Sequence, residues 1–223
     1  MGTMITLTAD DGFRLGAYRA DPSFKVAKGL VVIQEIFGVN KHMKRVTDAF
    51  AADGYVAIAP AIFDRVERDY DTGYSQEEID RGRATRGKCD LDQLVMDVKA
   101  AVTQLKSEGL KVGVVGYCLG GTMAWLAATR IDGIAAAVPY YGGGVAAAAN
   151  EKPKCPVLLH FGETDASIPA DHWETVKKAH PEIPQHIYPA GHGFNCDERG
   201  SWHEPSAKLA RQRTMEFFAQ HLA

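Results

Sequence analysis

The stretch VGVVGYCLGGTMAWLAA, from Val112 to Ala128, decides the fold. A short apolar run, a glycine-rich turn and a longer apolar segment follow one another, which predicts a buried strand, a sharp turn and a helix. Cys118 lies at the tip of the turn, between Gly116 and Gly120. Many hydrolases carry a serine between two glycines in such a turn, so the pattern predicts a nucleophile, here a thiol.

The residues around the thiol fit this interpretation. Gly116 and Gly120 remove side chains that would collide where the backbone reverses, and Gly121 lets the helix pack closely. The helix that begins after Cys118 directs its positive N-terminal end at the sulfur, which favours the thiolate. The main-chain N–H of Leu119 is a candidate donor to an oxyanion.

Outside this stretch, short apolar runs alternate with helical patterns. A hairpin is expected over residues 5–20, with its turn at residues 10–12. Further strands are expected over residues 29–38, 55–63, 112–116, 134–142, 155–165 and 185–191. Helices are expected over residues 42–52, 90–107, 119–129, 170–179 and 206–221, and the charged segment 64–88 is expected to be an excursion or a short helix.

This alternation predicts an α/β fold with a mostly parallel sheet and helices on both faces. The chain has 223 residues, of which 46% are hydrophobic, and this suits one domain over residues 1–223. Ligands of such sheets bind at the carboxyl ends of the strands. The functional residues are therefore expected in the loops that follow the strands.

Composition excludes several classes of function. The net charge is −3 and no basic arm is present, which argues against a nucleic-acid partner. No signal peptide or membrane span is expected, so the predicted location is cytoplasmic. The four cysteines are too widely spaced for a C-x-x-C pair, which predicts reduced thiols. No metal and no cofactor are expected, and Cys89, Cys155 and Cys196 are expected to be passive.

Three strand-end loops carry the residues of a catalytic triad. Cys118 follows the strand at residues 112–116, Asp165 follows the apolar residues 157–161 in the segment GETD, and His192 follows the last strand in PAGHGF. The order of nucleophile, acid and histidine along the chain is that of an α/β-hydrolase. His192 would exchange the proton, and Asp165 would fix its tautomer and stabilise the imidazolium.

Other titratable residues have weaker claims. His160 lies within a strand and is expected to be a hydrogen-bonded core histidine. His42, His172, His180, His186, His203 and His221 are expected at the surface. A zinc site at His192, Cys196 and His203 matches no common ligand spacing. Glu35 ends a very apolar strand, where a carboxylate is costly unless it is paired; it is either a buried acid near the thiol or a residue turned to solvent.

The segments QEIFG, GYCLGG, YYGG, GETD and GHGF together resemble the dienelactone hydrolases (carboxymethylenebutenolidases), a branch of the α/β-hydrolases. The resemblance covers nearly the whole chain. It implies that Cys118 is the nucleophile, His192 the base and Asp165 its partner. It also implies that Glu35 contacts the thiol of the free enzyme, keeps it neutral and takes its proton when substrate binds. The implied oxyanion hole is the backbone of Ile36 and Leu119, and the implied substrate-binding residues include Phe37 and Tyr141.

The resemblance also implies two arginines that hold a substrate carboxylate. Arg81, Arg83 and Arg86 compete for the first position. At the second position, four residues past the histidine, this chain has Cys196, and Arg199 is the nearest replacement. Hydrolysis of an ester or lactone is therefore better supported than the dienelactone itself.

The favoured function is a cysteine-dependent hydrolase of a lactone or small ester, with conversion of dienelactone to maleylacetate in aromatic-compound degradation as the favoured reaction. The partner is then a small molecule, and the resemblance favours a monomer. The alternatives are a broader carboxylesterase or thioesterase, a non-catalytic ligand-binding relative and a redox-sensing thiol protein.

Overall fold

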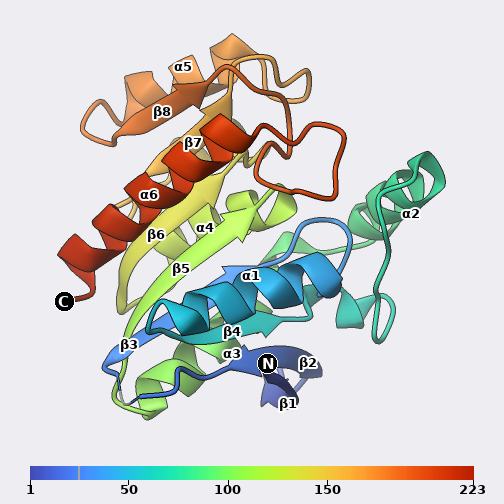
Figure 1. Cartoon of the computed structure of the whole chain (residues 1–223), viewed down its shortest axis with the longest axis vertical. Coiled ribbons are helices and arrows are strands. Elements are labelled where there is room, and N and C mark those ends of the chain that lie inside the picture. Colours follow the sequence, from blue (N-terminus) through green and yellow to red (C-terminus); the bar gives the residue numbers. More distant parts are fainter. Residues whose placement is uncertain (25) are drawn as a thin grey trace. The chain divides into compact units, whose positions relative to one another are not determined.

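The computed structural model describes residues 1–24 and 26–223 and divides the chain into two compact units, Met1–Val114 and Val115–Ala223. Each unit is a layer of strands with helices packed against it (Figure 1). The strand order is β1-β2-β4-β3 in the first unit and β5-β6-β7-β8 in the second. Strand β5 (Lys111–Tyr117) begins in the first unit and ends in the second.

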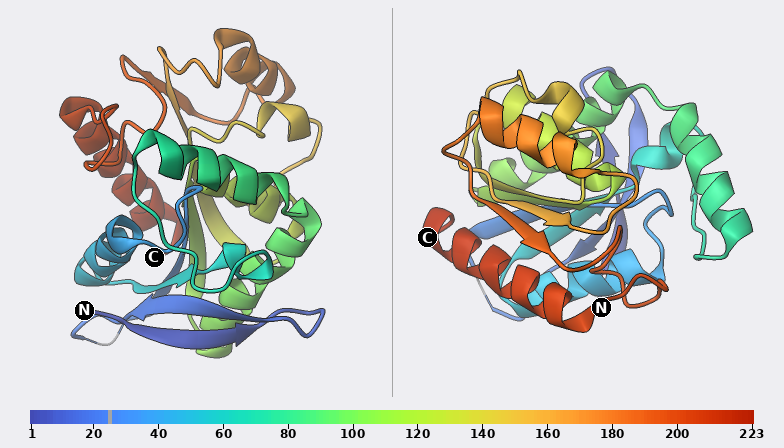
Figure 2. Two further views of the ribbon diagram at one scale, coloured as in Figure 1. Left: turned by 90° about the vertical axis from the view of Figure 1, so that its right-hand side faces the viewer. Right: turned by 90° about the horizontal axis from the view of Figure 1, so that it is seen from above.

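The first unit contains the predicted N-terminal hairpin. Strands β1 (Thr3–Thr8) and β2 (Arg14–Ala20) are antiparallel, and β2 is also antiparallel to β4 (Val56–Pro60). Strand β4 is parallel to β3 (Lys28–Ile33). Helices α1 (Lys41–Ala52) and α3 (Leu91–Ser107) cover opposite faces of these strands (Figures 1 and 2). The predicted hairpin and both predicted helices are confirmed, with small shifts in their bounds.

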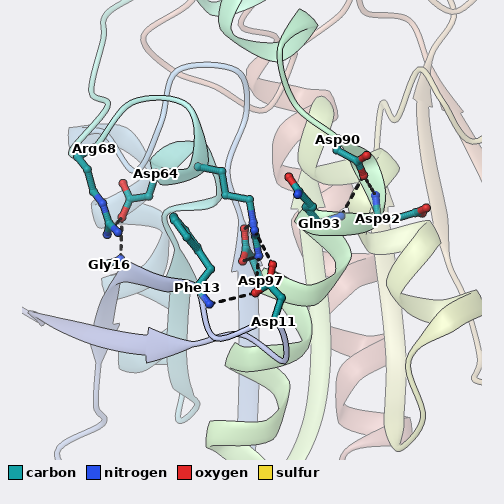
Figure 3. Close-up of polar contacts among 10 residues, drawn as sticks. Asp11, Phe13, Gly16, Asp64, Arg68, Asp90, Asp92, Gln93 and Asp97 are labelled. Atoms are coloured by element: carbon teal, nitrogen blue, oxygen red, sulfur yellow. Dashed lines mark hydrogen bonds and ion pairs between the residues drawn. The ribbon is translucent and has the colours of Figure 1, made fainter.

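A polar cluster joins the hairpin turn of this unit to α3 (Figure 3). Arg65, at the end of the short helix η1 (Ile62–Arg65), donates to both carboxylate oxygens of Asp97 at 2.8 Å and to Asp11 at 2.8 and 3.1 Å. Its guanidinium also lies 4.4 Å from the ring centre of Phe13. Burial raises the pKa of Asp97 to about 6, against the opposing effect of Arg65. The cluster therefore fixes the hairpin on α3 through one buried carboxylate.

The charged segment 64–88 contains helix α2 (Gln76–Gly87), so the helical alternative for this segment is confirmed. Ser75 and Glu78 form a capping box at its start, in which each side chain accepts a hydrogen bond from the other residue's backbone. This local signal explains how a helix forms with almost no apolar face.

In the second unit, β6 (Ile134–Tyr140), β7 (Leu159–Gly162) and β8 (Gln185–Tyr188) are parallel. Helix α4 (Leu119–Arg130) and helix α5 (Ala170–Ala179) cover one face, and α6 (Glu204–His221) covers the other (Figure 2). A short helix, η2 (Ala146–Ala148), follows β6. The carboxyl ends of β5, β7 and β8 lead into the loops that carry the predicted triad.

Five predicted strands are longer than the observed ones. Strands β3, β4, β6 and β8 end at Ile33, Pro60, Tyr140 and Tyr188, and β7 covers only Leu159–Gly162. Apolar residues continue past the strand ends because the loops there are buried as well; Phe37 and Ile62 are at most 1% exposed. Hydropathy therefore marked burial correctly and overestimated the length of backbone pairing.

Two histidines predicted at the surface are buried, which corrects that expectation. His42 is 6% exposed and His180 is 8% exposed. The Nε2 of His180 donates to the carbonyl oxygen of Ala149 at 2.8 Å, and its ring packs edge-on against Trp125. His160 is fully buried with both ring nitrogens hydrogen-bonded, so its expected core role is confirmed. Among the helices of the described residues, none has the length and hydropathy to cross a membrane.

Candidate active site

Cys118 lies between β5 and α4 in a strained backbone conformation, with φ 56° and ψ −115°. Such a conformation costs about 1–3 kcal/mol and persists only where its surroundings enforce it. A Cβ atom on Gly116 would lie 1.9 Å from the carbonyl oxygen of Gly120, and one on Gly121 would lie 2.2 Å from that of Tyr140. The glycines around the thiol are therefore required by the close approach of the backbone.

His192 and Asp165 lie beside this thiol, as the chain order predicted. The Nε2 of His192 is 3.0 Å from the sulfur of Cys118, and its Nδ1 is 2.7 Å from Oδ2 of Asp165. Asp165 is 3% exposed, and its Oδ1 accepts a hydrogen bond from the N–H of Ser167 at 2.8 Å. The three side chains form a continuous hydrogen-bonded line, with the carboxylate at its buried end.

The surroundings of His192 favour its charged form. Burial by itself would lower the pKa of His192, but the charge of Cys118 and the hydrogen bonds with Asp165 and the sulfur together raise it to about 10. A charged imidazole donates from both nitrogens, Nδ1 to the carboxylate and Nε2 to the sulfur. The two contacts of His192 therefore fit a charged ring that donates from both of its nitrogens.

Tyr141 was predicted to bind substrate, and the structure places it against His192. Its ring centre lies 5.2 Å from that of His192, in an edge-on arrangement, and the residue is 1% exposed. Its backbone also has a positive φ of 36°. The side chain supports the imidazole ring and has little surface left for a ligand.

Glu35, Ile36 and Phe37 follow β3 in the first unit. Glu35 is 1% exposed, which excludes the alternative that it turns to solvent. One of its carboxylate oxygens lies within 4.8 Å of a ring nitrogen of His42. Phe37 is also 1% exposed, and its ring packs edge-on against that of Tyr74, with 4.5 Å between the two ring centres.

The predicted arginines differ in their surroundings. Arg81 forms an ion pair with Glu67, and Nη1 of Arg83 lies 3.3 Å from Oδ1 of Asp80. Arg86 donates to the carbonyl oxygen of Cys89 at 3.4 Å.

Arg199 lies next to the predicted histidine. A Cβ atom on Gly193 would lie 2.3 Å from its Nη1, so the guanidinium rests against the residue that follows His192. Of these four arginines, Arg199 is the one whose described contacts place it beside the triad.

Sequence reasoning missed two backbone groups that hold Cys118 and Asp165 in place. The carbonyl oxygen of Tyr140 accepts the N–H of Cys118 at 3.1 Å, and Ser167 donates its N–H to Asp165. The second contact has a sequence signal, because aspartate often accepts the N–H two residues further on in an Asx-turn. The first depends on tertiary structure.

The family model of the dienelactone hydrolase family matches residues 15–222 of this chain. The chain belongs to the dienelactone hydrolase family. The carboxymethylenebutenolidase of Pseudomonas putida is 32% identical over 226 residues, which cover 96% of this chain and 95% of that protein. A relative from Azospirillum brasilense is 37% identical over 232 residues and 99% of both chains.

A crystal structure of a Klebsiella pneumoniae protein assigned to the dienelactone hydrolases has the same fold. It superposes with a TM-score of 0.83 at 29% identity, over 98% of this chain and 99% of that one. The predicted fold class, α/β with a mostly parallel sheet of the α/β-hydrolase type, is therefore confirmed, as is the prediction of a carboxylic ester hydrolase.

Proposed function

We propose that this family member is a cysteine-dependent hydrolase of a lactone or small ester, in which Cys118, His192 and Asp165 form the catalytic triad. The observation that carries the proposal is the pair of contacts at His192, 3.0 Å to the sulfur and 2.7 Å to the carboxylate. A histidine held between a thiol at a strained turn and a buried aspartate has no simpler structural explanation.

The proposed reaction has two stages. The thiolate of Cys118 attacks the carbonyl carbon, the bond to the ester oxygen breaks, and the departing oxygen receives the Nε2 proton of His192, which leaves a thioester. Water then attacks the thioester carbon as the now neutral Nε2 takes a proton from it. The carbon–sulfur bond breaks, the acid is released, and the thiolate–imidazolium pair is restored.

The negative oxygen of each tetrahedral intermediate requires hydrogen-bond donors. Leu119 is the first residue of α4, so its N–H is one of the free donors at a helix N-terminus. The family resemblance assigns the second donor to the backbone of Ile36. Both groups are fixed by the backbone, so they require no reorganisation during the reaction.

The role of Glu35 in the proposal rests on the family resemblance and on its burial. The resemblance assigns the free enzyme a neutral thiol turned toward this carboxylate, which accepts the proton when substrate binds. Here the sulfur lies 3.0 Å from His192, the arrangement that the resemblance assigns to the substrate-bound state. We propose that both arrangements belong to the reaction cycle.

The favoured substrate is a dienelactone, converted to maleylacetate in the degradation of aromatic compounds. Its carboxylate would be held by an arginine, and the position of Arg199 beside Gly193 makes this residue the first choice over Arg81 and Arg83. We propose a cytoplasmic monomer that acts on a small molecule without a cofactor. One family model spanning residues 15–222 supports a single domain.

A broader carboxylesterase or thioesterase is the second candidate. The observation that favours it is Cys196, which occupies the position where the resemblance implies an arginine and is fully buried. If Arg199 does not replace that arginine, uncharged esters should be the better substrates.

The two candidates are separated by steady-state hydrolysis of cis- and trans-dienelactones and of aryl acetates, with a Cys118→Ala control. Turnover of a dienelactone that exceeds turnover of the acetates supports the first candidate, and the reverse supports the second. Activity of the control variant comparable to that of the unmodified enzyme would exclude both. Binding without turnover by the unmodified enzyme would instead indicate a ligand-binding relative.

A further inference from the structure

A line of buried hydrogen bonds joins helix α6 to the end of strand β6. Thr214 of α6 is fully buried, and its hydroxyl oxygen lies 2.6 Å from the hydroxyl of Tyr140 and 3.1 Å from Nε2 of His160. The Nδ1 of His160 lies 2.8 Å from the hydroxyl of Tyr188, which accepts from Arg213 at 3.1 Å. We call these five residues the α6–β6 line.

The direction of these hydrogen bonds follows from the donor at one end. Arg213 can only donate, so the Tyr188 oxygen accepts from it and is free to donate its own proton to Nδ1 of His160. The proton of His160 then lies on Nε2 and points to Thr214. Burial lowers the pKa of His160 well below its usual value, and nearby His186 and Arg213 act in the same direction, so the ring is neutral as this pattern requires.

The line ends at the residue that holds the nucleophile. The carbonyl oxygen of Tyr140 accepts the N–H of Cys118, and it is also the atom against which Gly121 packs. The next residue, Tyr141, donates its N–H to the carbonyl of His160 at 2.8 Å and packs its ring against His192. The end of β6 thus supports both the thiol and the imidazole.

We propose that Thr214 is a positioning residue for hydrolysis: its hydroxyl, shared by Tyr140 and His160, fixes the end of β6 and thereby the distance between Cys118 and His192. The inference rests on the proposed function of these two residues and goes beyond it by assigning a role to α6. Neither Thr214 nor His160 touches the sulfur or the triad histidine in the described contacts, so their effect is indirect.

The physical argument concerns what happens when the hydroxyl is lost. Tyr140 and His160 would each lose a partner in a site without water access, and a buried polar group without a partner is unfavourable. The two side chains would shift to find other partners, and the main chain of β6 would move with them. A displacement of about 1 Å near the reacting groups can lower turnover by about a hundredfold.

The test compares Thr214→Val, which keeps the shape and removes the hydroxyl, with Thr214→Ser, which keeps the hydroxyl. Thr175→Val is the matched control, because Thr175 is an exposed helical threonine of α5 whose hydroxyl bonds only to the backbone of Asp171 in the described contacts. The measurements are kcat and KM for an aryl acetate, the pH dependence of Cys118 alkylation by iodoacetamide, and the thermal unfolding midpoint.

The proposal expects Thr214→Val to lower kcat by about tenfold or more with little change in KM, and to shift the pH dependence of alkylation. Thr214→Ser, which keeps the hydroxyl, should have the kcat and the alkylation profile of the unmodified enzyme. Thr175→Val should match the unmodified enzyme as well. If Thr214→Val lowers only the unfolding midpoint and leaves kcat and the alkylation profile unchanged, the hydroxyl is merely structural and the inference is wrong.

A second variant keeps the test decisive if Thr214→Val does not fold. Tyr140→Phe removes the same hydrogen bond and retains the ring, and it should produce the same loss of kcat. A Cys118→Ala control separates this inference from the proposed function. If that variant is inactive while Tyr140→Phe and Thr214→Val are fully active, the inference fails and the proposed function stands; if Cys118→Ala is active, the proposed function itself fails.

Discussion

Replacing Asp165 by asparagine tests the charge arrangement at His192 directly. The substitution keeps the size of the side chain, and its Oδ1 can still accept from Ser167. It replaces the carboxylate oxygen that lies 2.7 Å from Nδ1 of His192 by an amide group. If that group presents its N–H₂, Nδ1 must accept, so the ring becomes neutral with its one proton on Nε2, and the imidazolium that donates from both nitrogens is lost.

The size of the effect can be estimated from the surroundings of His192. The rise of its pKa from 6.5 to about 10 corresponds to roughly 5 kcal/mol in favour of the charged ring, taking about 1.4 kcal/mol for each pH unit. The charge and hydrogen bond of Asp165 supply part of this, and a charge-assisted hydrogen bond alone contributes about 1.5–3 kcal/mol. Together with the wrong tautomer, we expect kcat/KM of Asp165→Asn to fall by about 10³–10⁴-fold.

The pH dependence gives a second readout. In the unmodified enzyme the imidazolium is present below its pKa and is lost as the pH rises through about 10, so kcat/KM should decline there as the leaving oxygen loses its proton donor. In Asp165→Asn this alkaline decline should move to lower pH, because the folded enzyme loses a group that holds the proton on the ring. The assay is hydrolysis of an aryl acetate between pH 5 and 11.

Glu163→Gln is the matched control, because Glu163 is an exposed acid two residues away from Asp165. It should retain the activity and the pH profile of the unmodified enzyme. Retention of more than a tenth of kcat/KM by Asp165→Asn, with an unshifted alkaline decline, would refute the reasoning and show that the carboxylate does not govern the ring.

Four further predictions concern other parts of the site. Cys118→Ser should lose at least about 10²-fold in kcat, since a hydroxyl is much harder to deprotonate than a thiol; equal activity in the hydrolysis assay would exclude a site adapted to sulfur. Arg199→Ala should lower kcat/KM for an acidic lactone by about 10–100-fold, the loss of one charge-assisted contact, and should leave aryl acetates unaffected; if Arg81→Ala or Arg83→Ala does so instead, the anchor lies in the first unit. Glu35→Gln should accelerate alkylation of Cys118 and slow turnover, and unchanged labelling by mass mapping would remove the carboxylate from the mechanism. Gly121→Ala should lower the free energy of unfolding, measured by denaturant titration, by more than about 2 kcal/mol, because its Cβ would lie 2.2 Å from a carbonyl oxygen. Gly87→Ala, whose Cβ would have no atom within 4 Å, should be neutral or stabilising in the same titration.

The positions of the three residues of the proposed triad could be predicted because each follows a strand of the sheet. Parallel strands present their carboxyl ends at one edge, so Cys118, Asp165 and His192 could be expected together before any contact was known. The glycines around Cys118 added a local requirement that the structure bears out in the close approach of Gly116 to the backbone of Gly120. Chain order and local steric limits were sufficient for this part of the site.

The surroundings of the triad could not be predicted in the same way. Whether His180 is buried depends on Trp125 and Ala149, which lie far from it in sequence. Thr214 lies in a helix with no polar motif, and its partners Tyr140 and His160 come from two different strands. Periodicity indicates which face of an element is buried, but it does not indicate which buried polar groups meet across that face.

These tertiary contacts matter because the turn at Cys118 is unfavourable by itself. A backbone at φ 56° and ψ −115° costs about 1–3 kcal/mol, and the hydrogen bonds around it must offset that cost. The carbonyl of Cys118 accepts the N–H groups of Gly121 and Thr122 within the turn, whereas its own N–H depends on Tyr140 alone among the described contacts. The first two bonds are local to the motif and form wherever the helix forms. The bond from the Cys118 N–H to Tyr140 is available only if the end of β6 is held in place. A glycine-rich turn with a thiol therefore specifies where the nucleophile lies in the chain. The packing of β6 determines whether that nucleophile is held in reach of His192.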